Sequence, residues 1–154
     1  MLDRALPLRR CTTADYPVIV KHQCPKRLIF AKVKRMRIVL KSKIHRVWVT
    51  DANPDYIGSI LIDADLMDKA DIWNFEKVLV CDVTNGNRFE TYAIAGERGS
   101  GVCSIQGGAA RLSSKGNCLI VMSFQVTSTP IEPKMILVDK ENQFVEYLGV
   151  GQHV

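Results

Sequence analysis

Few side chains in this sequence suit catalysis by the common routes. Of the three histidines, His22 and His153 lie toward the two ends, and only His45 lies in the interior of the chain. A lone histidine in a β-prone segment is more often a packing or hydrogen-bonding residue than a general base. The sequence contains no GxSxG elbow, no glycine-rich phosphate loop and no HExxH motif. Conventional hydrolase and kinase chemistry therefore has little support.

The segment 51–63 (DANPDYIGSILID) offers a different chemistry. In its Gly58-Ser59 pair, a hydroxyl follows a peptide bond whose carbonyl residue has no Cβ, which allows close approach and unusual backbone angles. A Gly-Ser pair alone says little, and a second one stands at Gly99-Ser100. The first differs in its context, because a turn and Tyr56 precede it and a β-prone run follows it.

Further short motifs stand around this pair in a defined order. They are Lys43-Ile44-His45-Arg46 upstream, then Thr84-Asn85-Gly86, Arg88-Phe89, Thr91-Tyr92, Gly96-Glu97-Arg98-Gly99-Ser100 and Gly107-Gly108-Ala109-Ala110 downstream. The ordered set spans residues 37–147 without a long gap and resembles the bacterial aspartate 1-decarboxylases. A dozen matched positions in order is far more specific than any single motif.

The resemblance implies an enzyme that makes its own cofactor. The serine hydroxyl would attack the preceding carbonyl to form an ester, and elimination and hydrolysis would then leave a pyruvoyl group and release ammonia. By resemblance the chain is cut between Gly58 and Ser59, and Ser59 becomes the pyruvoyl. That group would form a Schiff base with L-aspartate and accept the electrons left when CO2 departs. The product would be β-alanine, used in pantothenate synthesis.

The resemblance also assigns residues to the substrate. Tyr92 matches the catalytic proton donor, and Arg88 suits the side-chain carboxylate because its planar guanidinium can donate two parallel hydrogen bonds. The remaining matched positions bind or border the substrate, and Thr91 is also linked to self-cleavage; they are Thr91, Gly107, Gly108, Ala109, Lys43 and Tyr56. The family forms homotetramers with active sites between neighbouring subunits.

Ordinary structural roles compete with these assignments. Arg88 beside an Asn-Gly turn could be a solvated hairpin residue, and Tyr92 on a strand could be a packed aromatic. In an ideal strand Thr91 and Tyr92 point to opposite faces, while Arg88 and Tyr92 share a face about 13 Å apart at ~3.3 Å per residue. Either the long side chains converge or the strand bulges.

Three positions depart from the family pattern. Gln106 stands where asparagine is usual, Gly108 where alanine is usual, and Cys81 where a larger aromatic is frequent. A longer amide at Gln106 could displace a hydrogen bond in a tight site, which bears on substrate affinity and turnover. Ser59, Tyr92 and Arg88 are unaffected.

The elements that must position these residues are mostly strands. Asp65 is a candidate N-cap for a short helix that carries Leu66, Met67 and Ala70. Turn chemistry at 51–55 and the Asn85-Gly86 pair, where both turn residues should take positive φ, separate β-prone runs. We expect strands over 43–50, 59–62, 78–83, 89–94, 102–105, 118–126, 135–138 and 144–148. Short strands with frequent turns favour a mainly β protein and a small closed barrel; the resemblance specifies the double-psi type, with one or two short helices.

The positive charge of the chain lies in its first segment. The 154 residues carry a net charge of +5, but residues 1–35 hold nine Lys or Arg against two Asp, so the rest has a net charge of −2. We expect 1–35 to be a basic, proline-interrupted extension, disordered or not native with Met36 as the start, and 36–154 to be the decarboxylase domain. A nucleic-acid binder would carry its basic patch on the folded domain, so no nucleic-acid partner is expected.

The remaining composition bears on compartment and cofactor. Five widely spaced cysteines form no CxxC or Cys/His cluster, so no metal is expected and a cytoplasmic, reducing compartment fits best. No run approaches the ~18 apolar residues of a membrane span.

Two alternatives stay open. One is a non-processing β-barrel binding or regulatory module on the same scaffold, and the other is a nucleic-acid or membrane-surface protein that acts through its basic leader.

Overall fold

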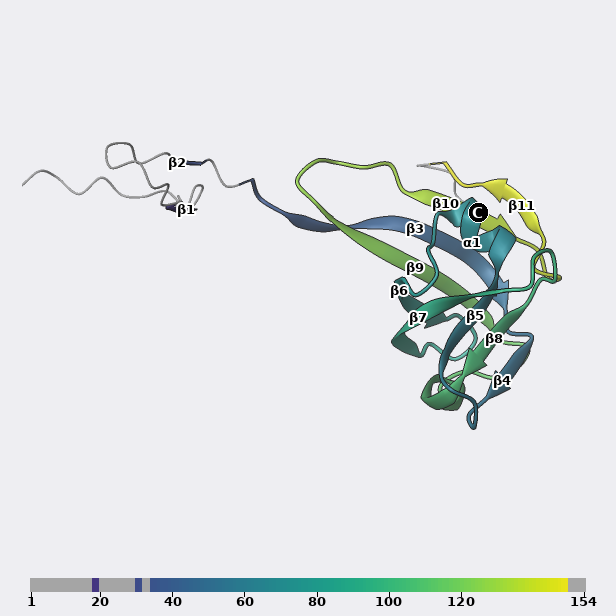
Figure 1. Ribbon diagram of the computed structural model, residues 1–154. Coiled ribbons are helices and arrows are strands. Elements are labelled where there is room, and N and C mark those ends of the chain that lie inside the picture. Colours follow the sequence, from purple (N-terminus) through teal and green to yellow (C-terminus); the bar gives the residue numbers. More distant parts are fainter. Residues whose placement is uncertain (1–17, 20–29, 32–33, 150–154) are drawn as a thin grey trace, which may run out of the picture. The chain divides into compact units, whose positions relative to one another are not determined.

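The computed structural model describes residues 18–19, 30–31 and 34–149 (Figure 1). The chain divides into two compact units, Met1–Met36 and Arg37–Val154. In the first unit, β1 (Val18–Ile19) pairs antiparallel with β2 (Phe30–Ala31). The expectation of a disordered or non-native extension concerns residues that lie mostly outside the described ones.

The second unit is built from nine strands in one mixed sheet. They are β3 (Arg37–Trp48), β4 (Asp51–Asn53), β5 (Ser59–Asp63), β6 (Lys77–Asp82), β7 (Arg88–Gly96), β8 (Cys103–Gln106), β9 (Cys118–Thr127), β10 (Lys134–Val138) and β11 (Phe144–Tyr147). Their order in the sheet is β11-β10-β3-β9-β6-β7-β5-β8-β4. Two short helices, α1 (Ala64–Ala70) and the 3-10 helix η1 (Gly107–Arg111), complete the unit.

The sheet closes on itself because β3 and β4 are almost one strand. β3 pairs with β9, and β4, which begins three residues after β3 ends, pairs with β8 at the other side of the sheet. Thr50, between them, donates from its backbone N–H to the Cys103 carbonyl at 2.7 Å. The strands β9, β6, β7, β5 and β8, together with the joined β3 and β4, therefore form a small barrel (Figure 1). β10 and β11 extend the sheet beyond β3. The expectation of a mainly β protein with a small barrel is confirmed.

The core follows from alternation along the strands. In β6, Val78 and Val80 are buried while Lys77 is exposed, which is the period of two that a strand imposes. The inward set also includes Ile60, Ile62, Ile105, Leu119 and Val121, each completely buried. Ile44 and Val47 are three residues apart and yet both completely buried, because the register of β3 shifts between His45 and Val47. Burial of one such side chain stabilises the fold by about 1.5–3 kcal/mol. These residues hold the strands that carry the candidate site.

Two local details differ from expectation. Asp51–Asn53 forms the strand β4 where a turn was expected, because pairing with β8 extends it. The 83–87 loop does join β6 and β7 as a hairpin, but among its residues only Gly86 has positive φ, at +80°. The Asp82 carboxylate accepts from the backbone N–H of Thr84 and Asn85, and this sets a loop longer than a two-residue turn.

The helix α1 carries Leu66, Met67 and Ala70 on its buried side, as expected. The prediction of Asp65 as its N-cap is wrong. Asp63 is the cap and accepts from the Asp65 N–H at 2.8 Å, whereas Asp65 lies inside the first turn. Among the described residues, no helix is long and apolar enough to cross a membrane.

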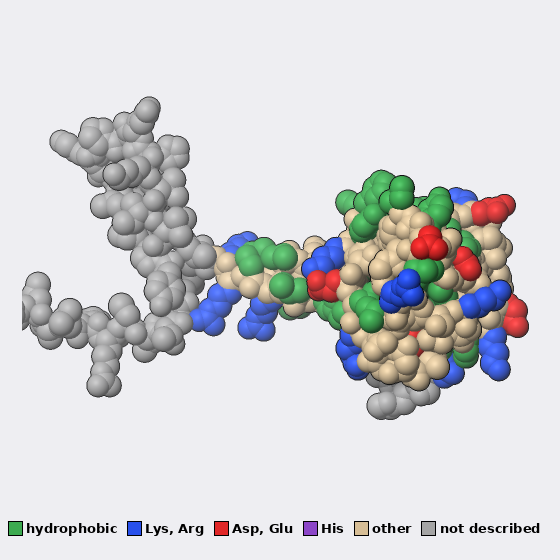
Figure 2. Space-filling model, turned by 90° about the horizontal axis from the view of Figure 1, so that it is seen from below, with side chains coloured by type: hydrophobic (Ala, Val, Ile, Leu, Met, Phe, Trp, Pro, Cys, Tyr) green, Lys and Arg blue, Asp and Glu red, His purple; other side chains and the backbone are tan. Residues whose placement is uncertain are grey.

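The charges of the second unit are mixed. On the face seen in Figure 2, Lys and Arg side chains are interspersed with Asp and Glu over the body of this unit. Several large hydrophobic residues are nevertheless exposed, among them Ile57, Trp73 and Phe75 at 87%, 72% and 68%. These three come from the two turns that flank the candidate site.

Candidate active site

The Gly58-Ser59 junction lies at the entry to β5. Ser59 is 2% exposed and has a φ of +147°, a conformation that costs a residue with a side chain on the order of 1–3 kcal/mol. The Ser59 hydroxyl oxygen is buried and has no hydrogen-bond partner among the described residues. A buried hydroxyl without a partner is costly, so this serine is not explained by a hydrogen bond that it contributes to the fold.

The backbone at Gly107 packs directly against this junction. Gln106 is the cross-strand partner of Ser59, and Gly107 follows it with a φ of +65°. A Cβ at Gly107 would lie 2.7 Å from the Gly58 Cα, closer than such atoms approach. A Cβ at Gly58 would lie 3.4 Å from the Gln106 carbonyl oxygen. Close backbone approach therefore explains Gly107, whereas the contact at Gly58 is an ordinary van der Waals distance.

Tyr92 reaches the same junction from β7. This strand runs parallel to β5, with Ala93 opposite Ile60. The Tyr92 hydroxyl donates to the Gly58 carbonyl oxygen at 3.1 Å, and the residue is 40% exposed. A proton donor thus faces the carbonyl of the bond that would be cut, with access to solvent.

The other residues expected to bind the substrate have fewer contacts with the Gly58-Ser59 junction. Ala109 is half-buried against the core, and Gly108 is exposed with nothing within 4 Å of a Cβ built on it. Thr91 is half-buried opposite Val78, and its side chain makes no hydrogen bond with another described residue. The structure therefore gathers Gly58, Ser59, Tyr92 and Gly107 at one point, with Ala109 and Gly108 on the adjoining helix η1.

No hydrogen bond joins Arg88 or Lys43 to the junction within the described part of one chain. β6 and β7 pair one-to-one from Arg88 to Tyr92 without a bulge, so Arg88 stays at the far end of this stretch. Its guanidinium donates to the Gly86 carbonyl oxygen at 2.8 Å. Lys43 lies on β3, which pairs with β9 and β10 and not with β5. The geometric difficulty seen in the sequence is thus real for a single subunit.

Phe75 is a residue that the sequence did not single out. It lies 17 positions before Tyr92, in the turn between α1 and β6, and its ring centroid is 6.3 Å from that of Tyr92. The turn also contains Ile72 and Trp73, so an apolar side chain at Phe75 does not stand out in the sequence. Nothing in the local pattern indicates which ring it contacts.

The buried cysteines of the barrel and His45 do not offer a reactive group. Burial raises the pKa of the Cys103 thiol to about 12, and burial also raises that of Cys118, so neither is a ready nucleophile. Burial lowers the pKa of His45, helped by the charges of Lys43 and Arg46. His45 lies on β3, away from the junction. No three His, Cys, Asp or Glu side chains within the described part of the chain are grouped to hold a metal ion.

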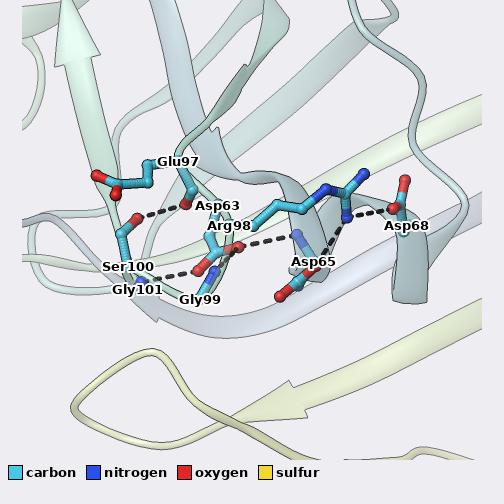
Figure 3. Close-up of polar contacts among 8 residues, drawn as sticks. All are labelled: Asp63, Asp65, Asp68, Glu97, Arg98, Gly99, Ser100 and Gly101. Carbon is cyan, nitrogen blue, oxygen red and sulfur yellow. Dashed lines mark hydrogen bonds and ion pairs between the residues drawn. The ribbon is translucent and has the colours of Figure 1, made fainter.

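Asp63 anchors the far end of β5 (Figure 3). Its carboxylate accepts from three backbone N–H groups, those of Asp65 at 2.8 Å, Gly99 at 3.1 Å and Gly101 at 2.7 Å. Arg98, in the same loop, donates to Asp65 and Asp68 at 2.7 Å each. The Gly96–Ser100 motif is thus explained as a loop folded around Asp63, which holds β5, α1 and the end of β7 together.

Asp63→Asn should lower the free energy of unfolding by about 1.5–3 kcal/mol for each charge-assisted bond lost, because an amide presents one acceptor oxygen in place of two. Urea unfolding in an uncut Ser59→Ala chain measures this without interference from cleavage. Asp65→Asn is the matched control, since its ion pair with Arg98 is exposed to solvent and should contribute little to stability. Equal effects of the two substitutions would show that Asp63 is not the anchor.

Comparison with known proteins shows which family the sequence matches. The sequence profile of the aspartate decarboxylase family matches residues 35–145. The aspartate 1-decarboxylase of Acetivibrio thermocellus is 48% identical over 119 residues, which cover 75% of this chain and 94% of that protein. The aspartate 1-decarboxylase of Clostridium botulinum (strain 657) has the same identity and coverage.

The chain belongs to the aspartate decarboxylase family, and the resemblance found in the sequence is confirmed.

Proposed function

We propose that this protein cuts itself between Gly58 and Ser59 and then decarboxylates L-aspartate to β-alanine with a pyruvoyl group derived from Ser59. The observation that carries the proposal is the buried, unbonded Ser59 hydroxyl beside a strained peptide bond, in a chain similar to proteins named aspartate 1-decarboxylase. Among the described residues, Ser59 is the one where a buried hydroxyl without a partner coincides with a positive φ.

Self-cleavage requires no added oxidant or reductant. The Ser59 hydroxyl oxygen attacks the Gly58 carbonyl carbon, the amide nitrogen leaves with a proton, and an ester replaces the amide. Elimination of the Gly58 carboxylate and the Ser59 α-proton gives dehydroalanine, which takes up water and releases ammonia. Two features support the first step: the strain at Ser59 is relieved by cleavage, and Tyr92 donates to the oxygen that becomes negative.

The surroundings of Ser59 fit the group that this sequence of steps makes. A pyruvoyl is a small ketone without a hydrogen-bond donor, and the Ser59 hydroxyl that its formation would remove has no hydrogen-bond partner to lose among the described residues. The ketone supplies an acceptor for the electrons of the broken C–C bond. Tyr92 holds a proton at its phenol oxygen, beside the position where a carbanion would be protonated. Gly107, Gly108 and Ala109 would line the substrate.

Arg88 and Lys43 would bind the substrate in an assembly of chains. Neither makes a hydrogen bond to the Gly58-Ser59 junction among the described residues of one subunit, and we propose a homotetramer whose sites combine residues of neighbouring subunits. Exposed apolar surface supports assembly: on the projecting ribbon of β3 and β9, Ile38 lies opposite Val126, and they are 75% and 59% exposed. A two-stranded ribbon is marginal in water unless it is covered.

Mass spectrometry of purified protein together with an assay for β-alanine tests the function. We expect two fragments, residues 1–58 and 59–154, the second with a pyruvoyl end, and β-alanine formed from added L-aspartate. A single chain of full mass that forms no β-alanine would instead establish the non-processing module.

We also propose a cytoplasmic enzyme whose basic extension has no part in the fold. The free thiols of Cys81, Cys103 and Cys118 support a reducing compartment, and the family match begins only at residue 35.

Removal of residues 1–35 should leave cleavage, assembly size and turnover within about twofold of the full chain, because the barrel core lies in the second unit. Size-exclusion chromatography and the β-alanine assay measure this. Loss of the folded assembly on truncation would show that the extension is structural.

A further inference from the structure

Phe75 is an exposed phenylalanine in a backbone conformation that favours glycine. Its φ is +67° and it is 68% exposed, so the side chain strains the backbone and gains little from burial. A strained residue of this kind persists only where the surrounding structure holds it, and it points to a functional constraint. The question is which contact requires the ring.

The turn that carries Phe75 is held to β7 on both sides of the ring. The Phe75 N–H donates to the Ala93 carbonyl at 2.7 Å, and the Ala93 N–H donates to the Glu76 carbonyl at 2.9 Å. The Glu76 carboxylate accepts from the Trp73 N–H and from Lys41, at 2.8 Å and 2.9 Å. Burial would raise the pKa of Glu76, but these hydrogen bonds outweigh burial and lower it, so the carboxylate stays ionised. The turn is therefore rigidly placed.

The held turn brings the Phe75 ring against Tyr92. Their centroids are 6.3 Å apart and the ring planes are tilted by 44°, a favourable aromatic arrangement. No other ring contact of Phe75 occurs within the described residues. Tyr92 is 40% exposed, and an exposed side chain can leave its rotamer unless a neighbour restrains it. Phe75 is that neighbour on the side of the turn.

We propose that Phe75 is a positioning residue for Tyr92, keeping the Tyr92 hydroxyl directed at the Gly58-Ser59 junction. Phe75 does not touch the reacting atoms; it acts through the ring that it restrains. The consequence for turnover rests on the proposed function, in which Tyr92 is the proton donor. The restraint itself is a property of the folded chain, cut or uncut.

A double-mutant cycle on fully cleaved protein tests the consequence. Phe75→Ala should lower kcat by about 3- to 10-fold, which is the effect expected when one aromatic pair is lost. KM should change by less than about twofold. Phe75→Tyr keeps the ring and should restore kcat. In a Tyr92→Phe background, Phe75→Ala should cause no further loss, because there is no hydroxyl left to position.

Nuclear magnetic resonance of the uncut Ser59→Ala chain tests the restraint without any activity. The Tyr92 ring resonances should carry the shift that a neighbouring ring causes, and Phe75→Ala should remove it while Phe75→Tyr preserves it. Unchanged Tyr92 resonances in Phe75→Ala would overturn the proposal, whether or not the protein is a decarboxylase.

Two other results would also overturn it. A full, additive loss from Phe75→Ala in the Tyr92→Phe background would mean that Phe75 acts on something other than the hydroxyl. A change in assembly size on Phe75→Ala would place Phe75 at an interface between chains. Wild-type turnover in Tyr92→Phe alone would refute the proton-donor role, and the resonance measurement would then decide the restraint separately.

Discussion

Ser59→Ala protein is expected to remain one uncut chain of 154 residues and to form no β-alanine. The substitution removes the hydroxyl that is proposed to attack the Gly58 carbonyl, and with it the oxygen from which the ester would form. The loss should therefore be complete and not graded. Folding should be little affected, because the Ser59 hydroxyl makes no hydrogen bond within the described residues. Intact-mass measurement after prolonged incubation, together with the β-alanine assay, gives the result.

The chain supplies its own matched control in the second Gly-Ser pair. Gly99 has a φ of +68°, and the Ser100 hydroxyl donates to the Glu97 carbonyl oxygen at 2.6 Å, so this serine is exposed and already bonded. Ser100→Ala should cut and turn over normally. A cut in Ser59→Ala protein, or an uncut Ser100→Ala protein, would show that the wrong serine has been chosen.

Tyr92→Phe should lower turnover of L-aspartate by about 10²-fold or more, the loss typical of a missing general acid. The ring and its contact with Phe75 are kept, and only the hydroxyl is removed. KM should change less, because the proton is needed mainly in the transition state. Steady-state kinetics on fully cleaved protein measure both constants.

The structure adds a consequence for processing. Because the Tyr92 hydroxyl donates to the Gly58 carbonyl oxygen, its removal should slow self-cleavage. Cleavage should still reach completion, since each chain cuts once and water can replace a donor at this partly exposed position. A time course by mass spectrometry separates this delay from the catalytic defect.

Arg88→Ala provides the contrast. If Arg88 binds the side-chain carboxylate across a subunit boundary, its removal should raise KM as well as lower kcat, without slowing the cut. An unchanged KM would leave Arg88 as the hairpin residue that its bond to Gly86 suggests. Wild-type turnover in cleaved Tyr92→Phe would show that the proton comes from elsewhere, such as water.

The sequence by itself determined the local elements and the family of the protein. Alternation predicted the strands, because the side-chain period of a strand depends only on neighbouring residues. The residues expected to form strands lie largely within strands of the structure, although β3 begins at Arg37, earlier than expected. The ordered motifs identified the family that the comparisons confirm. The roles of individual site residues remain proposals.

Other features depend on residues far apart in the chain. Asp63 and Asp65 are both of a residue type that can cap the N-terminus of α1. Asp63 is the cap, and its carboxylate also accepts hydrogen bonds from the backbone N–H groups of Gly99 and Gly101. The Asn85-Gly86 loop takes its form from Asp82, which also accepts from Ser113 and Asn117. Such bonds are specified by the packing of distant strands and leave no local pattern.

Only the tertiary structure decided which residues meet at Ser59. Tyr92 arrives through the parallel pairing of β5 with β7, and Gly107 through the antiparallel pairing of β5 with β8. Phe75 arrives through a turn clamped to Ala93, while Arg88 and Lys43 stay apart within one chain. A pattern of residue types gives the face on which a side chain lies, but strand order and register give its neighbours, and these are set by burial of the whole core.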